Sequence, residues 1–273
     1  GTDPDSDRVG IMVRDKDGEY KVMTGNQTGV VLLDYMLGAM KRTGKLPRNP
    51  VALKTIVTTE MARTVAESYG AACFDTFTGF KFIAEKKNAL EGSGEGRVVF
   101  SYEESYGYML GDYVRDKDAV TASLLLTEMA AYYAAKGMTV LDALQALYEK
   151  HGFYGEKTHN LVMPGLDGLA DMARLMKRLR EEPPAEIGGV KVAQRKDYAD
   201  GSVIDCATGE KSAMELSGSN VLRFELADGT SIIVRPSGTE PKIKVYILTK
   251  GADAAERDAN VAKYSQWVET LKK

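Results

Sequence analysis

The sequence contains few cysteines and histidines, and this scarcity excludes several kinds of site. Only two cysteines, Cys73 and Cys206, occur among 273 residues, and neither belongs to a CxxC or Cys/His cluster. We therefore expect two buried free thiols in a reducing cytosol rather than a disulfide or a metal centre. The two histidines, His151 and His159, have no partners at the spacing of metal ligands or of a catalytic triad. We expect both at the surface or at helix ends.

Long apolar runs and an excess of one charge are missing as well. No apolar stretch reaches the length of a membrane-spanning helix and no signal peptide is recognisable, so we expect no membrane partner. The formal net charge of −3 provides no basic excess, so we expect no nucleic-acid partner. Hydrophobic residues make up 44% and charged residues 27% of the chain, as is typical of a globular cytoplasmic protein. Any binding of anions must therefore come from local clusters.

The pattern of strands, helices and turns predicts two kinds of architecture in one chain. The length of 273 residues indicates about two domains. Strands and helices alternate over residues 25–150, which predicts an α/β domain with a mixed, mostly parallel sheet and helices on both faces. Short strands and Gly/Asp turns fill residues 187–248, which predicts a smaller α+β domain. Residues 157–164 are expected to be part of a connection that lets the second domain move.

The individual elements follow from apolar spacing and from glycine and proline breaks. The predicted helices span residues 28–43, 61–69, 80–90, 117–136, 140–150, 167–182 and 252–271. The predicted strands before the second domain span residues 9–13, 20–23, 51–57, 72–75 and 97–101.

The first polar cluster is DPDSDR, which begins at Asp3 and ends at Arg8. In an extended loop, Asp3, Asp5 and Asp7 point the same way, and three carboxylates suit a hard divalent cation such as Mg²⁺. An EF-hand is excluded, because its sixth position would be Arg8 instead of Gly and its twelfth Arg14 instead of Glu. The spacing alone leaves a solvated acidic segment as an equal alternative.

Two further clusters follow the strand at residues 97–101. In YEESYGY, Glu103 and Ser105 offer hydrogen-bonding groups for sugar hydroxyls, at the carboxyl end of a strand where α/β sheets bind ligands. In VRDKD, basic residues including Lys117 precede a long helix whose N-terminus favours an anion. The alternatives are an ordinary polar loop for YEESYGY and helix capping by Asp116 or Asp118 for VRDKD.

The last cluster is RPSGTEPKIK, which lies between two predicted strands. Arg235 offers a planar fork for two phosphate oxygens, and Ser237 and Thr239 offer hydroxyls. Gly238 allows backbone N–H groups to turn inward as an anion-binding nest. A tight turn with a surface arginine does not explain this combination, so we favour phosphate binding.

In this order, DPDSDR, TGFK, YEESYGY with VRDKD, and RPSGTEPKIK resemble the motifs of the α-D-phosphohexomutases, the phosphoglucomutase/phosphomannomutase family. The resemblance covers nearly the whole chain. It implies the end of a second, metal-binding domain in residues 1–24, a sugar-binding third domain in residues 25–153, and a connection with a phosphate-binding fourth domain in residues 154–273.

The resemblance also implies residue roles. Mg²⁺ would be held by Asp3, Asp5 and Asp7, and Arg8 is the one catalytic candidate. The hexose phosphate would be bound by Thr78, Gly79, Phe80, Glu103, Ser105, Lys117, Arg235, Ser237, Gly238 and Thr239. The implied reaction interconverts hexose 1- and 6-phosphates, glucose being favoured, through a phosphoserine and a bisphosphosugar. Mannose, pentose or bisphosphate-synthase specificity stays open, as does a stand-alone sugar-phosphate binding module.

One family motif is absent from the sequence. The serine loop of the type TASHNP does not occur, and Thr121-Ala122-Ser123 runs into three leucines within a predicted helix. The chain also opens on a polar turn without an initial methionine. We therefore expect a piece of a longer protein, inactive by itself, whose preceding domains carry the phosphoserine.

Overall fold

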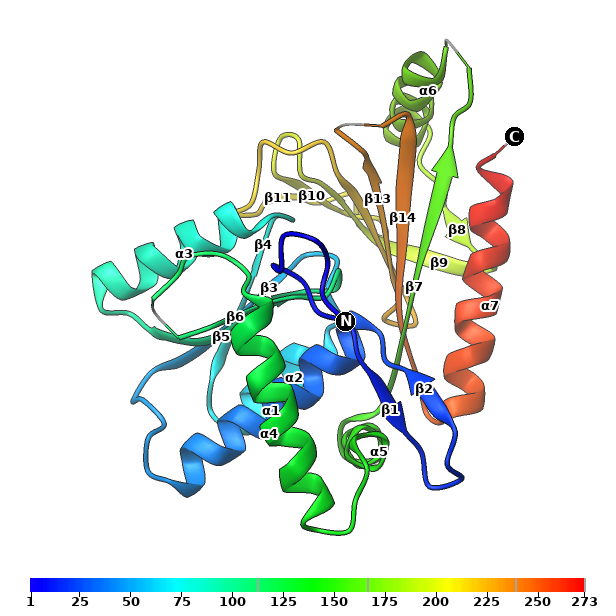
Figure 1. Ribbon diagram of the computed structural model, residues 1–273. Helices are drawn as coiled ribbons and strands as arrows, with labels where there is room; N and C mark the ends of the chain where they lie inside the picture. Colours follow the sequence, from blue (N-terminus) through cyan, green and yellow to red (C-terminus); the bar gives the residue numbers. More distant parts are fainter. Residues whose placement is uncertain (112, 166, 239, 273) are drawn as a thin grey trace. The chain divides into compact units, whose positions relative to one another are not determined.

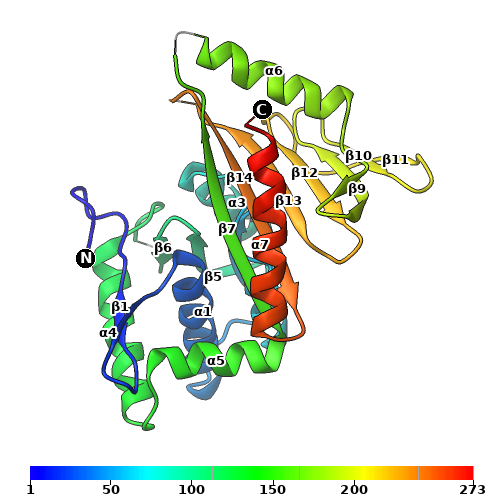
Figure 2. The ribbon, with the colours of Figure 1, turned by 90° about the vertical axis from the view of Figure 1, so that its right-hand side faces the viewer.

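The computed structural model describes residues 1–111, 113–165, 167–238 and 240–272 (Figures 1 and 2). The chain divides into two compact units, Gly1–Gly152 (unit 1) and Phe153–Lys273 (unit 2). Unit 1 contains β1 (Met12–Arg14), β2 (Tyr20–Val22), α1 (Gly25–Arg42), β3 (Pro50–Thr55), α2 (Met61–Ser68), β4 (Ala72–Thr76), α3 (Phe80–Ser93), β5 (Arg97–Glu103), β6 (Gly107–Leu110), α4 (Ala119–Ala134) and α5 (Val140–His151).

The central sheet of unit 1 has the strand order β4-β3-β5-β6. The pairs β3–β4 and β3–β5 are parallel, whereas β5–β6 is antiparallel. Every residue of β3 is buried, as expected for a parallel strand that is covered on both faces. The predicted mixed, mostly parallel sheet is confirmed. The sequence prediction missed β6, which is only four residues long and follows β5 through a tight polar loop.

Helices cover both faces of this sheet. On one face, α3 places Phe80 and Ile83 against Leu53 of β3 in a buried apolar cluster. On the other face, α1 lies so close to β5 that a Cβ atom on Gly29 would be 2.1 Å from the ring of Tyr102. Glycine is therefore required at this point of α1 so that the helix can reach the sheet.

The ends of the helices follow from capping. Thr24 and Gln27 form a reciprocal capping box, so α1 begins three residues before the predicted start. Thr139 and Asp142 form the same arrangement at the start of α5. Ser123 lies inside α4, which confirms that Thr121-Ala122-Ser123 belongs to a helix. None of the helices in the described residues is long and apolar enough to cross a membrane.

Unit 2 is built from antiparallel strands and two helices in the described residues. It contains β7 (Phe153–Val162), α6 (Gly168–Glu181), β8 (Glu186–Ile187), β9 (Val190–Asp197), β10 (Ser202–Asp205), β11 (Lys211–Ala213), β12 (Leu222–Leu226), β13 (Ser231–Pro236), β14 (Lys242–Gly251) and α7 (Ala254–Thr270). The strand order is β11-β10-β9-β12-β13-β14-β7, and β8 pairs with β9. The predicted α+β architecture is confirmed.

One face of this sheet carries the core of unit 2. Ile243, Val245 and Ile247 alternate along β14 and pack with apolar residues of α6 and α7. Figure 2 shows α7 running along the β7–β14 part of the sheet. The period of two along β14 places the intervening residues, including Lys244, on the opposite face.

The segment expected as a connection at residues 157–164 is in fact strand as far as Val162, so that prediction is wrong. Strand β7 pairs with β14 from Phe153↔Gly251 to Val162↔Lys242. Its polar residues concealed the strand, because an edge strand is held by backbone pairing rather than by a continuous apolar pattern. His159 is also not a surface residue: it is mostly buried, its Nε2 lies 2.9 Å from Ser265 Oγ, and burial lowers its pKa. Of the two thiols expected to be buried, Cys73 is buried but Cys206 is exposed, because it lies in the turn after β10.

Candidate functional site

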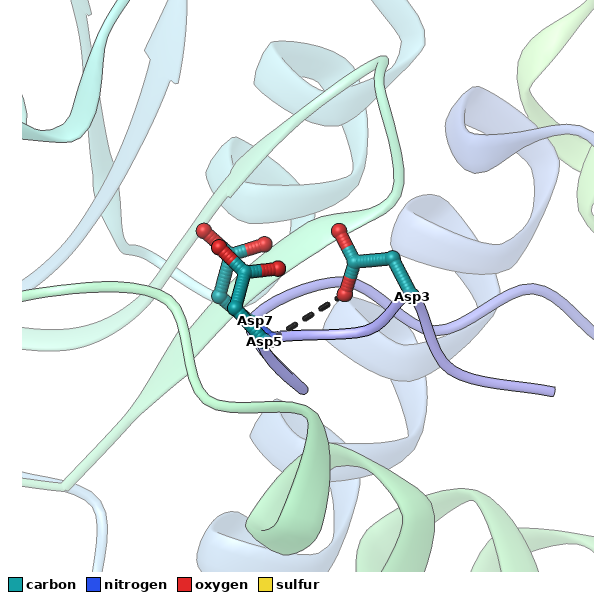
Figure 3. A group of neighbouring side chains, drawn as sticks. All are labelled: Asp3, Asp5 and Asp7. Carbon is teal, nitrogen blue, oxygen red and sulfur yellow. Dashed lines mark hydrogen bonds between the residues drawn. The ribbon is translucent and has the colours of Figure 1, made fainter.

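The three aspartates near the start of the chain converge in the structure. Each offers a carboxylate oxygen, and these oxygens lie within 4.8 Å of one another. Figure 3 shows Asp5 and Asp7 side by side with Asp3 across from them, and the backbone N–H of Asp7 donates to Asp3 Oδ1 at 3.2 Å. The sequence prediction assumed an extended loop, but the structure shows a different conformation. It turns back on itself, with Ser6 at φ 56° and its N–H bonded to the Asp3 carbonyl at 3.0 Å.

Arg8 is bound to the same loop. Its Nε lies 2.6 Å from Asp3 Oδ2 and 3.4 Å from Asp7 Oδ1. Although partial desolvation opposes the effect, the hydrogen bonds from the Arg8 backbone and guanidinium lower the pKa of Asp3 to about 2. Asp3 therefore stays ionised across the physiological pH range, as a metal ligand or ion-pair partner must.

The aspartate loop is docked on the sheet of unit 1 by backbone contacts. The N–H of Val9 donates to the Tyr106 carbonyl at 3.1 Å, and Arg8 forms an isolated β-bridge with Gly107. At the start of α4, the N–H of Ala119 donates to the Ser6 carbonyl at 3.0 Å. The aspartate loop is therefore positioned by the start of α4 and by the segment YEESYGY (residues 102–108), which is called the sugar loop below.

Lys117 joins the aspartate loop to the region beside β6. Its Nζ lies 2.5 Å from Asp7 Oδ2 and 3.3 Å from Asp116 Oδ1. The side chain passes over Gly107, where a Cβ atom would lie 2.6 Å from Lys117 Cδ, and Nζ lies 5.5 Å from the centre of the Phe80 ring. Lys117, predicted from the sequence to lie near the ligand, is thus a direct partner of a predicted metal ligand.

The two segments predicted to face the sugar are joined to each other. Glu103, at the end of β5, is buried, and its Oε1 accepts a hydrogen bond from the N–H of Gly79 at 2.6 Å. Gly79 has φ 112°, a conformation that favours glycine. Thr78 and Ser105 are half-buried next to these residues in the sequence, whereas the Phe80 ring is buried in the core of unit 1.

Sequence reasoning missed a buried charge network behind the sugar loop. Lys54, near the end of β3, is completely buried, with its Nζ 2.8 Å from Asp75 Oδ1 and 3.0 Å from Glu60 Oε1. Desolvation lowers the pKa of Lys54, but the two carboxylates outweigh it and raise the pKa. Thr55, the next residue, donates to Glu104 Oε2 at 3.4 Å. The sequence feature that could have indicated this network is the single lysine within the apolar run VALKTIV, because a lysine is rarely buried without a charged partner.

The predicted phosphate loop connects β13 to β14 in unit 2. Arg235 is half-buried near the end of β13, and the N–H of Ser237 donates to the Lys242 carbonyl at 2.8 Å. The carbonyl of Pro241 accepts from the N–H of Met163 at 2.8 Å. Gly238 is exposed and its φ is outside the left-handed range, so backbone conformation does not require glycine here. Thr239 lies outside the described residues.

Comparison with known proteins is consistent with these features. Residues 24–151 match the family model described as phosphoglucomutase/phosphomannomutase, alpha/beta/alpha domain III, and residues 160–262 match its C-terminal domain. A phosphoglucomutase of Staphylococcus epidermidis is 36% identical over 247 residues, and one of Staphylococcus aureus is 36% identical over 252 residues. The chain belongs to the phosphoglucomutase/phosphomannomutase family.

Solved structures support the fold. The phosphoprotein pp63/parafusin, a phosphoglucomutase from Paramecium, matches 99% of the chain with a TM-score of 0.65 and 18% identity. An N-acetylphosphoglucosamine mutase from Aspergillus fumigatus, in complex with GlcNAc-6P and magnesium, matches with a TM-score of 0.52 and 12% identity. The matched regions cover 90–92% of this chain but 44% of the two staphylococcal relatives. The chain therefore spans less than half the length of these relatives.

Proposed function

We propose that this chain is the substrate-recognition part of a phosphohexomutase that interconverts hexose 1-phosphate and hexose 6-phosphate, with glucose phosphates favoured. The proposal rests above all on the 36% identity to phosphoglucomutases over nine-tenths of the chain. In the proposed cycle, a phosphoserine outside this chain donates its phosphoryl group, a bisphosphosugar forms, and the other phosphate returns to the serine. Such reactions depend on positioning and charge neutralisation rather than on covalent chemistry by many side chains.

The residues of the aspartate loop fit a magnesium ion. Asp7 Oδ1 is buried and, within the described residues, accepts no hydrogen bond; Arg8 Nε lies 3.4 Å away, and Oδ2 is bound to Lys117. A buried carboxylate oxygen without a hydrogen-bond donor is costly, and a cation closer than the Arg8 guanidinium would satisfy it. Carboxylate oxygens are the ligands that Mg²⁺ prefers, and bound Mg²⁺ neutralises charge on a transferring phosphoryl group. Asp3, Asp5 and Asp7 would hold the ion, and Arg8 keeps Asp3 in place.

The remaining candidate residues would bind different groups of the substrate. Glu103 and Ser105 would bind sugar hydroxyls. Thr78 and Gly79 would face the sugar from the adjoining segment, where the Gly79 N–H donates to Glu103. Phe80 would support this loop from the core. Lys117 would balance negative charge near the aspartates, and Arg235 with Ser237 and Gly238 would hold the phosphate that does not react. The hydroxyl of Thr239 belongs to the same proposal.

Calorimetry on the purified chain tests the binding roles. We expect glucose 1-phosphate to bind, Arg235→Ala to weaken it at least tenfold, and the urea unfolding midpoint of the variant to stay near that of the parent chain. Unchanged affinity in Arg235→Ala would remove that residue from the proposal. Mannose 1-phosphate and ribose 1-phosphate, titrated in parallel, decide between the substrate alternatives.

A second experiment separates the mutase from a stand-alone binding module. A coupled assay is run on this chain and on a protein that also carries the preceding domains of a relative, with and without Mg²⁺. Turnover only in the longer protein, lost in Asp5→Ala, supports the mutase. Full turnover without any divalent cation would contradict the metal role.

A further inference from the structure

A small cavity opens on the α6 side of the sheet in unit 2, between the end of α6 and the strands β9, β10 and β12. Its volume is about 190 Å³. Sites for drug-sized ligands measure roughly 300–1,000 Å³, so this cavity suits a smaller molecule. Its lining is mainly apolar, with Leu179, Pro183, Ile204, Leu222 and Phe224 contributing.

The strand register explains why a cation also lines this apolar cavity. Arg195 of β9 is directly opposite Ile204 of β10 on one side and Phe224 of β12 on the other. Directly opposite residues carry their side chains on the same face of a sheet. Phe224 belongs to the core that packs against α6, so Arg195 lies on this face as well. The proposed phosphate residue Arg235 lies on the other face, because it follows the core residue Val234 along β13.

Arg195 is half-buried and, in the part of the chain that the structure describes, has no carboxylate partner. The acid two residues further along the same face is Asp197, and both of its oxygens are bound by Arg180, at 2.7 Å and 3.3 Å. Lys196 alternates to the other face, where its Nζ lies 2.9 Å from Glu225 Oε1. On the face of the cavity, the charges of Arg180 and Asp197 cancel, so the positive charge of Arg195 is left unbalanced.

We infer that this cavity binds a small organic monocarboxylate with an apolar body. The Arg195 guanidinium offers a planar fork that fits both oxygens of a carboxylate. One unbalanced cation matches one negative charge, whereas a phosphate dianion would bring a second charge that the cavity does not neutralise. The apolar side chains of the lining would remove the body of the ligand from water. The site is separate from the proposed phosphate residues, because it lies on the opposite face of the sheet.

An NMR titration of the isotope-labelled chain tests this inference, with hexanoate as the probe. The Arg195 Nε–H signal should shift as hexanoate is added, together with backbone signals of β9 and β10. Arg195→Leu should weaken binding, read from those backbone signals, at least tenfold, because a charge-assisted bidentate contact is lost. Arg195→Lys keeps the charge without the planar fork, so its affinity should fall between the two.

Lys191→Met is the matched control. Lys191 is an exposed cation on the same strand as Arg195, but it does not line the cavity. The control variant should bind hexanoate within twofold of the parent chain. Equal losses in Arg195→Leu and Lys191→Met would overturn the inference, because they would reflect the overall charge of the chain alone.

Two further probes test the two halves of the ligand. Hexanamide has a similar body without the charge, and inorganic phosphate has charge without the body. Both should bind at the cavity at least tenfold more weakly than hexanoate. Equal binding of hexanamide would reduce the site to an apolar cavity, and equal binding of phosphate would reduce it to a general anion site. Either result would refute a monocarboxylate site.

Urea unfolding distinguishes a ligand-binding residue from a structural one. Arg195→Leu removes a half-buried cation that has no acidic partner, so its unfolding midpoint should equal or exceed that of the parent chain. A lower midpoint together with unchanged hexanoate affinity would show that Arg195 supports the sheet instead, and would refute the inference.

Glucose 1-phosphate separates this inference from the proposed function. It should leave the Arg195 signal in place, and hexanoate should not compete with it. If glucose 1-phosphate binds but hexanoate shifts no signal around the cavity, the monocarboxylate site is refuted and the proposed function stands. If hexanoate binds and glucose 1-phosphate does not, the monocarboxylate site stands by itself.

Discussion

Gly25 is the first residue of α1, and the structure predicts that it cannot carry a side chain. A Cβ atom at this position would lie 2.1 Å from the carbonyl oxygen of Glu104 and 2.9 Å from the backbone nitrogen of Tyr106. Both atoms belong to the backbone of the predicted sugar loop, so no side-chain rotation relieves the clash. Ordinary van der Waals contact begins near 3.4 Å, so the loop would have to move by about 1.3 Å.

We expect Gly25→Ala to cost stability and sugar binding together. Overpacking typically costs roughly 1–3 kcal/mol, and the upper half of this range applies because backbone must move. The gain in helix propensity from Gly to Ala, at most about 1 kcal/mol, offsets part of this. A net loss of roughly 1–2 kcal/mol should be seen by urea unfolding. Since the loop carries Glu103 and Ser105, glucose 1-phosphate affinity should fall at least tenfold.

Gly92→Ala is the matched control for this substitution. Gly92 lies in the last turn of α3, and a Cβ atom there would meet nothing within 4 Å. Replacing a helical glycine without a clash should stabilise the chain by roughly 0.5–1 kcal/mol. If Gly25→Ala were as stable as the parent chain and bound equally well, while Gly92→Ala behaved as expected, the close approach of α1 to the sugar loop would be wrong.

Three other predictions follow from residues outside the proposed ligand contacts. Lys54→Met removes a buried cation from two carboxylates and should lower the free energy of unfolding by roughly 3 kcal/mol. This is the low end of the range for a broken buried ion pair, because Arg63 still binds both acids. An unchanged urea midpoint would contradict the network. Burial raises the pKa of the Cys73 thiol from its ordinary value near 9 to about 11. Because the pKa of the thiol is higher in the folded than in the unfolded chain, the free energy of unfolding should be unaffected below pH 9. It should fall by roughly 3 kcal/mol as the pH rises from 9 to 11, because the unfolded chain loses the thiol proton first. Cys73→Ala should flatten that part of the stability profile. Thr139→Ala should cost roughly 1 kcal/mol in thermal unfolding because the capping box with Asp142 is lost, and no change would show that the cap is not needed.

The elements of unit 1 were largely predictable because local signals agreed with the final packing. The apolar run of β3, the caps of α5 and the glycines that end several helices each indicate one structure. The prediction failed for β7, whose sequence KTHN reads as a polar connection. Only its partner β14, some 90 residues later in the chain, makes this segment a strand, and such long-range pairing leaves no periodic signal.

The candidate site, too, was predictable from the sequence only in part. The aspartate spacing predicted that three carboxylates would meet, but it could not show that a turn at Ser6 brings them together. The motifs also gave no indication of the contacts between them, such as Glu103 with Gly79 or Lys117 with Asp7. These contacts depend on the order of strands in the sheet, which one short motif does not encode.

The two units differ in how the charged residues proposed for recognition are balanced, and this difference has a consequence for the proposed binding. In unit 1, the cations Arg8 and Lys117 are bound to Asp3 and Asp7 of the aspartate loop, and the buried Glu103 is bound to a backbone N–H. A ligand there must share or replace existing contacts, so the net gain per contact is small. In unit 2, Arg235 stands opposite another cation, Lys244, whose partner on β7 is the neutral Asn160. Under the proposed function, a phosphate would supply charge that is missing there, so the proposed residues of unit 2 should provide most of the affinity and those of unit 1 most of the selectivity among hexoses.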